Sequence, residues 1–234
     1  MPRLSVHGLQ ITGGLTCVAA TLIAWWVSWV QLERGRTHFI SEVLALAWWQ
    51  RDDDSTKRGS RGSLLASLLF GAGALAFMLA AGFELRGAWT ASATWSAVTG
   101  ALLLAIVLVP MRLVAPARVL TAGGVDLLHP FLAAVFYLVA MATAVAIAWP
   151  HAGPVGIVLA ALHLLSSAVL SAAVLVLAPR ALGPAAFQPW YLPGVRILLD
   201  RRPAGETPSE WVRRLQWPAT LLVALDLGFT PTGI

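Results

Sequence analysis

The amino-acid sequence predicts an all-α integral membrane protein, a helical bundle of five transmembrane helices with a sixth membrane segment and a short interfacial helix. Hydrophobic residues make up 58% of the 234 residues and charged residues only 12%, about half the share that a soluble domain carries. Several apolar runs reach the roughly 20 residues that a helix needs to cross a bilayer. Residues 1–234 are therefore expected to form a single polytopic membrane domain.

The first three spans follow from the positions of the charges. No charged residue occurs between Arg3 and Glu33, so the first span is expected at residues 9–32. The second and third are expected at residues 63–83 and 88–109, with only a short turn between them. The first run is too long for a signal peptide and is not followed by a cleavage site, so we interpret it as a span.

The fourth and fifth spans form a predicted hairpin. No Asp, Glu, Lys or Arg occurs from Leu127 to Pro179, a stretch long enough for two crossings. Two prolines, Pro150 and Pro154, divide it, and proline interrupts a helix because it lacks a backbone donor. The spans are therefore expected at residues 127–149 and 154–178.

The sixth segment has a clear start and an uncertain end. Thr207, Pro208 and Glu210 fit an N-cap, a first helical position and a capping-box acid. The apolar part, residues 215–234, ends in a stretch that contains Gly228 and Pro231. Two alternatives remain open, a full crossing and a half-inserted helix.

One further helix is expected in the polar region that follows the first span. Its apolar residues share one face at helical spacing, but it is too short to span and is expected to lie flat in the interface. The residues on that face are Phe39, Ile40, Val43, Leu44, Ala47 and Trp48.

The basic residues predict the orientation. Fourteen of the 16 Lys and Arg residues fall in or beside three segments, 33–62, 110–126 and 179–214, and only Arg3 and Arg86 lie on the other side. Positively charged loops stay in the cytoplasm, so the N-terminus is expected outside. The Arg-rich, Lys-poor composition suggests a bacterial cytoplasmic membrane. Membrane lipids, with anionic head groups at the cytoplasmic face, are the expected partners, together with other proteins of a membrane complex, and nucleic acid is not.

Two ionisable residues stand inside expected spans, His163 in the fifth and Asp226 in the sixth. Such residues are costly in a bilayer and therefore point to function. If the two helices are neighbours, the imidazole and the carboxylate can pair, move protons or bind a cationic group. The alternative is a hydrogen bond that only joins two helices, or an Asp226 exposed to water.

Four other residues are weaker candidates. Glu42 and Glu84 could each act as a general acid, although each is more often a solvated side chain. Asp126 and His129 are three apart and share a helix face, but one such pair is not a metal site, and Asp126 is better interpreted as a helix cap. No cofactor motif occurs, and the single cysteine, Cys17, excludes a Cys-based metal site.

Three classes of function remain. The first is a transporter or an accessory membrane subunit that handles a hydrophobic or small solute. The second is a compact membrane-embedded enzyme acting on a lipid or isoprenoid, for example a cyclase with Asp226, His163, Glu42 or Glu84 as its acid or base. Eleven tryptophans could line its cavity, because indole faces attract cations. The third is a structural or regulatory protein.

Overall fold

The protein folds as a bundle of six long helices in the part of the chain that the structure describes. The computed structural model describes residues 6–31, 40, 43–44, 57–86, 90–109, 125–151, 153–172 and 208–230. These ranges contain no strand, so the predicted all-α class is confirmed for them. The helices are α1 (Val6–Trp26), continued by the π-helical turn η1 (Val27–Gln31), α3 (Lys57–Leu85), α4 (Ala91–Leu108), α6 (Val125–His151), α7 (Pro154–Ala172) and α10 (Pro208–Phe229).

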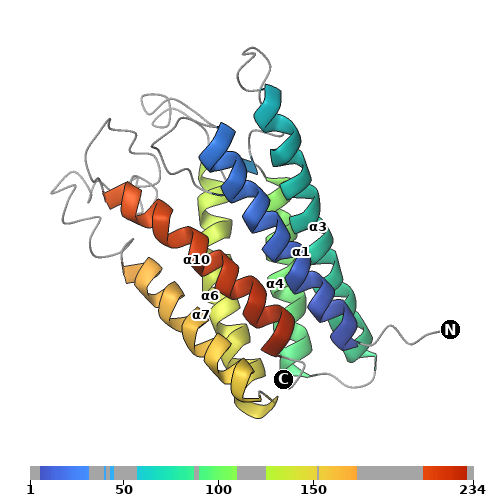
Figure 1. Ribbon diagram of the computed structural model, residues 1–234. Helices are drawn as coiled ribbons and strands as arrows, with labels where there is room; N and C mark the ends of the chain where they lie inside the picture. Colours follow the sequence, from blue (N-terminus) through green and yellow to red (C-terminus); the bar gives the residue numbers. More distant parts are fainter. Residues whose placement is uncertain are drawn as a thin grey trace.

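The six helices form a closed ring in which each reverses the direction of the one before it (Figure 1). Each helix packs on the next along the chain, and α10 returns to pack against α1. Only a few residues separate α3 from α4 and α6 from α7, and the helix ends that flank these intervals lie at the end of the bundle where α1 begins and α10 ends. The helix ends that flank the three longer intervals of sequence lie at the opposite end of the bundle. Antiparallel neighbours are what short connections favour in helical bundles.

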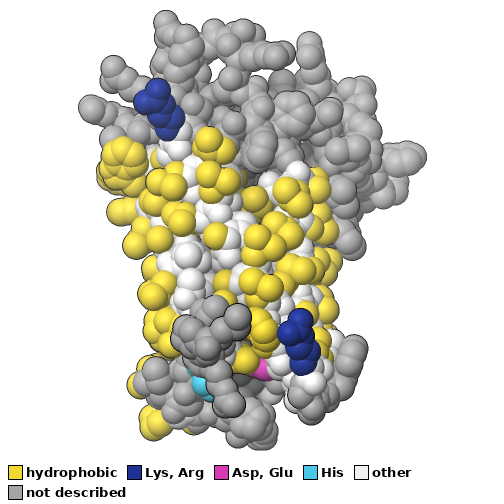
Figure 2. Space-filling view, turned by 90° about the vertical axis from the view of Figure 1, so that its right-hand side faces the viewer, with side chains coloured by type: hydrophobic (Ala, Val, Ile, Leu, Met, Phe, Trp, Pro, Cys, Tyr) yellow, Lys and Arg dark blue, Asp and Glu magenta, His cyan; other side chains and the backbone are white. Residues whose placement is uncertain are grey.

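The side chains on the outside of the bundle are larger and more apolar than those inside. On α7, Ile157 and Leu165 are 58% and 62% exposed, whereas Ala160, His163 and Ser167 are buried. Figure 2 shows hydrophobic side chains over the middle of one face and the described Lys and Arg side chains only toward its two ends. Three helical stretches are long and apolar enough to cross a membrane, Val6–Trp29, Arg61–Leu85 and Pro154–Ala172, which indicates a membrane protein.

Glycines allow the helices to approach closely. A Cβ atom added to Gly14 of α1 would lie 2.7 Å from the Cα of Gly228 on α10, and one added to Gly13 would lie 3.2 Å from the carbonyl oxygen of Gly73 on α3. The adjacent residues Gly13 and Gly14 thus allow two different helices, α3 and α10 respectively, to approach α1 closely. Small residues at such crossings are typical of helix packing in membranes.

Several helix boundaries differ from the predicted limits of the spans. Helix α3 begins at Lys57, before the expected residue 63, since Gly59 and Gly62 weaken a helix but do not end it as a proline would. Helix α6 continues through Pro150 to His151, since a proline in the last turn removes only one helical hydrogen bond. Helix α10 begins at Pro208, as the capping pattern predicts, and ends at Phe229.

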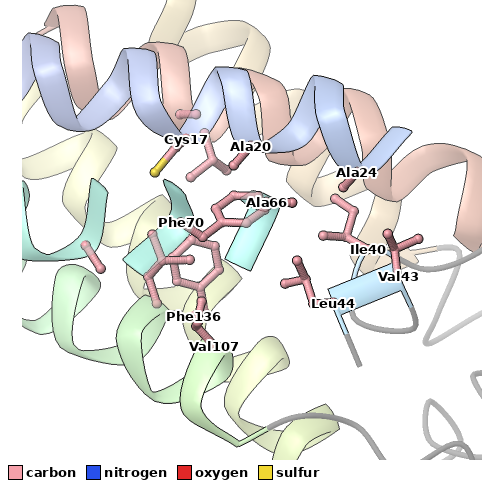
Figure 3. Packing of buried hydrophobic residues seen from close by; sticks show 14 of the residues in the cluster. Cys17, Ala20, Ala24, Ile40, Val43, Leu44, Ala66, Phe70, Val107 and Phe136 are labelled. Atoms are coloured by element: carbon pink, nitrogen blue, oxygen red, sulfur yellow. The ribbon is translucent and has the colours of Figure 1, made fainter. Parts of the chain in front are cut away.

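The predicted interfacial helix is described at Ile40, Val43 and Leu44 only. These residues are helical and almost fully buried, and they pack into the main hydrophobic cluster. Figure 3 shows them facing the bundle near Ala24 of α1. The three side chains therefore contact protein. The rest of that segment lies outside the described residues.

Candidate functional site

The structure brings His163 and Asp226 into contact at the interface between α7 and α10. His163 lies midway along α7, and Asp226 lies in the last turn of α10. The Nδ1 atom of His163 is 2.6 Å from Oδ2 of Asp226, and both side chains are buried, at 0% and 1% exposed. The sequence suggested this contact on the condition that the two helices are neighbours, and α7 and α10 do pack together.

The carboxylate of Asp226 also accepts a hydrogen bond from a hydroxyl group. The Oγ1 atom of Thr230, one turn beyond Asp226, donates a hydrogen bond to Oδ1 of Asp226. The same hydroxyl lies 3.4 Å from the carbonyl oxygen of Gly156 in the first turn of α7. A hydroxyl has a single proton, so the longer contact with Gly156 is the weaker one. Both carboxylate oxygens of Asp226 therefore have a hydrogen-bond partner, Oδ2 in His163 of α7 and Oδ1 in Thr230 at the end of α10.

Two polar atoms next to this pair have no hydrogen-bond partner in the part of the chain that the structure describes. They are Nε2 of His163 and Oγ of Ser167, one helical turn further along the same face of α7. Ser166, its neighbour, bonds instead to the carbonyl oxygen of His163. Buried polar atoms are nearly always paired, so these two are exceptions that call for an explanation.

A second feature, which the sequence did not reveal, is a cavity of about 50 Å³ between α3, α4, α6 and α10. Most of its wall is apolar, and five of its lining residues are labelled in Figure 3. The described lining residues are Ile40, Leu44, Phe70, Leu103, Ile106, Val107, Ala133, Phe136, Tyr137, Gln216 and Thr220. The cavity lies toward the end of the bundle where α10 begins, away from Asp226.

One wall of this cavity carries hydrogen-bonding groups. The hydroxyl of Tyr137 on α6 is 2.6 Å from Oγ1 of Thr220 on α10 and also bonds to the side chain of Gln216. Oε1 of Gln216 in turn accepts a hydrogen bond from the backbone N–H of Ile40 at 3.3 Å. One feature of the sequence could have indicated this polar wall. Gln216 and Thr220 are four residues apart in an apolar helix, which places both on one face.

Of the remaining candidate residues, only Glu84 has a described side chain, and it lies at neither place. Glu84 lies at the end of α3, half-buried, where its Oε1 accepts a hydrogen bond of 3.2 Å from Nε2 of Gln10 on α1. Asp126 and His129 lie in the first turn of α6, and their side chains are outside the described set, as is all of Glu42. Among the residues that the structure describes, no group of three His, Cys, Asp or Glu side chains could hold a metal.

Three tryptophans at the C-terminal end of α1 and in η1 face outward. Trp25, Trp26 and Trp29 are 50%, 50% and 72% exposed, and the rings of Trp25 and Trp29 stack at 6.2 Å. No tryptophan occurs among the described residues that line the cavity. These three tryptophans are therefore directed away from the bundle interior, whereas Trp217 of α10 is buried in the hydrophobic cluster.

No protein-family model, no curated protein and no solved structure matches this chain.

Proposed function

We propose that this chain is a six-span protein of the bacterial cytoplasmic membrane that holds a hydrophobic solute inside the bundle, as a transporter or as an accessory membrane subunit. The outward-facing leucines and the buried small or polar residues support the membrane location, since an apolar exterior suits lipid and not water. The antiparallel ring supports six crossings, including one by α10, whose 22 residues extend roughly 33 Å.

The charge distribution supports an N-terminus outside the cell. The helix ends that border the three longer intervals all lie at one end of the bundle, and fourteen basic residues occur there in the sequence. Anionic lipid head groups attract such residues at the cytoplasmic surface. The cavity would then lie in the cytoplasmic half of the bundle and the His163–Asp226 pair in the outer half.

The observation that carries the proposed function is the cavity with one polar wall. Small-molecule sites are typically concave and mostly apolar, with a few polar groups that fix orientation, and Tyr137, Gln216 and Thr220 supply such groups here. The volume of about 50 Å³ is well below the roughly 150 Å³ of an engineered cavity that accepts benzene. It therefore suits a small solute, or the end of an alkyl or isoprenoid chain.

The enzyme alternative receives less support from this geometry. An acid-catalysed reaction on an isoprenoid requires a proton donor at the reacting carbon. The described residues that line the cavity include no Asp, Glu or His. Both His163 and Asp226 are buried in the α7–α10 contact instead.

Native mass spectrometry of the protein extracted from its own membranes in mild detergent tests the proposal. The wild type is expected to retain a hydrophobic molecule or a protein partner. Ala133→Leu adds three carbon atoms to the cavity wall, so it should release a molecule bound there. Ala161→Leu is the matched control, because Ala161 is exposed on the outside of α7.

The outcomes separate the alternatives. Loss of the bound molecule from Ala133→Leu alone supports solute binding in the cavity. Equal retention by both variants places the molecule outside this cavity and contradicts the proposal. A wild type that retains neither a small molecule nor a partner protein also contradicts it and favours a structural role.

A further inference from the structure

The environment of His163 constrains the protonation state of the pair. The pair is buried between apolar helices, and an unpaired charge there is strongly unfavourable. Helices α1, α6 and α7 carry no Lys or Arg in their described residues. Helix α10 does carry two arginines, Arg213 and Arg214, but they lie about three turns before Asp226 along the helix. No basic side chain on these helices is therefore close enough to neutralise an isolated carboxylate. Asp226 also lies near the C-terminus of α10, where the helix dipole disfavours a negative charge.

Two forms of the pair carry no net charge. One is an imidazolium with a carboxylate, and the other is a neutral imidazole with a protonated carboxyl group. They differ only in the position of one proton along the 2.6 Å contact between Nδ1 and Oδ2. In both forms the other imidazole proton is on Nε2, which is therefore a hydrogen-bond donor and not an acceptor.

Nε2 and the hydroxyl of Ser167 then form two donors on one face of α7, four residues apart. Neither has a partner within the described ranges, and both residues are 0% exposed. Two donors that lie on the same helix face can share one oxygen acceptor. Since the His163–Asp226 pair is already neutral, an added anion would remain uncompensated, so the acceptor should be uncharged.

We propose that His163 and Ser167 form a buried binding site for an uncharged oxygen that accepts hydrogen bonds, either a water molecule or a carbonyl, ether or hydroxyl oxygen of a solute. Asp226 is the positioning residue, because it holds the imidazole by Nδ1 and keeps the proton on Nε2. The site is separate from the cavity beside Tyr137, so it can be present whether or not the cavity binds a solute.

Nuclear magnetic resonance of the full chain in lipid nanodiscs, labelled with ¹⁵N at histidine, tests the site. Nε2 of His163 is expected to show a directly bonded proton at neutral pH. Through-space transfer from this proton to water would identify a bound water molecule. Transfer to carbon-bound protons of a molecule extracted with the protein would identify a solute. An Nε2 without a proton, or a proton that contacts only protein, would overturn the site.

The signal of His163 is assigned by its loss in His163→Gln. If that variant does not fold, Gln in place of the other four histidines, His7, His38, His129 and His151, leaves His163 as the single signal.

A matched pair of serine variants tests the second donor. Ser167→Ala should keep the proton on Nε2 of His163. It should lose the through-space transfer from that proton to the bound water or solute. Ser166→Ala should keep both, because its hydroxyl bonds within its own helix. Unchanged transfer in Ser167→Ala would overturn the two-residue site.

Discussion

Gly14 of α1 and Gly228 of α10 meet at a crossing that leaves no room for a side chain on either residue. A Cβ on Gly14 would lie 2.7 Å from the Cα of Gly228 and 2.8 Å from the carbonyl oxygen of Ala224. Both neighbours are backbone atoms, which cannot turn aside as a side chain can. This contact joins the first and last helices and so closes the ring (Figure 1).

Gly14→Ala is therefore expected to destabilise the bundle by about 1–3 kcal/mol, the usual effect of overpacking. Gly71→Ala is the control, because a Cβ at Gly71 meets no atom within 4 Å. Alanine there should leave the stability unchanged or raise it by up to ~1 kcal/mol through helix propensity. Unfolding in mixed micelles with increasing SDS, followed by tryptophan fluorescence, gives both values. Equal effects of the two substitutions would show that the crossing is not close-packed.

The His163–Asp226 pair should show strong coupling in a double-mutant cycle. His163→Leu alone leaves Asp226 buried without its partner and is expected to cost about 3–5 kcal/mol. The double variant with Asp226→Leu should recover much of this loss, because apolar residues often replace a buried ion pair at little cost. Unfolding in mixed micelles with SDS, followed by tryptophan fluorescence, gives the free energies of all three variants.

The hydroxyl pair Thr99 and Thr143, 2.9 Å apart and also buried, provides the control cycle. Valine at one of these positions should cost about 1 kcal/mol. If the effects of His163→Leu and Asp226→Leu simply add, the two side chains do not interact in the folded protein.

Glu84 is expected to act as a hydrogen-bond acceptor and not as a catalytic acid. Glu84→Gln keeps an oxygen that can accept from Gln10, so stability should change by less than about 1 kcal/mol. Glu84→Ala removes that acceptor from the Gln10 amide, which is 4% exposed, and should cost about 1–3 kcal/mol. Any solute binding or turnover should survive Glu84→Gln, and its loss in that variant at normal membrane abundance would restore Glu84 as a candidate acid.

Cysteine labelling in intact cells tests the proposed orientation. A membrane-impermeant maleimide should modify Gly153→Cys, in the short turn before α7, from outside. Ser55→Cys, in the basic segment before α3, should react only after the membrane is broken. Cys17 is 2% exposed, so the wild type should remain unmodified and serves as the control. The reverse pattern would place the N-terminus in the cytoplasm.

The helices could be predicted from the sequence because each depends on local properties of its own segment. The charge-free stretch after Leu127 and its two prolines located α6 and α7 within a few residues, and the capping pattern at Thr207, Pro208 and Glu210 located the start of α10. Residues 57–62 fall in the polar segment expected at 33–62, whereas α3 already begins at Lys57. The sequence also selected His163 and Asp226, because ionisable residues are rare in apolar runs.

The sequence by itself determined an all-helical chain with apolar runs and a strongly asymmetric distribution of basic residues. Only the tertiary structure decided which helix faces meet. It paired His163 with Asp226 and Gly14 with Gly228, and it gathered Phe70, Tyr137 and Thr220 around one cavity. The physical reason is that lipid tails are as apolar as leucine, so hydrophobicity does not distinguish the inner face of a membrane helix from the outer one. Close packing of small residues and hydrogen bonds between distant segments make that distinction, and both depend on the whole bundle.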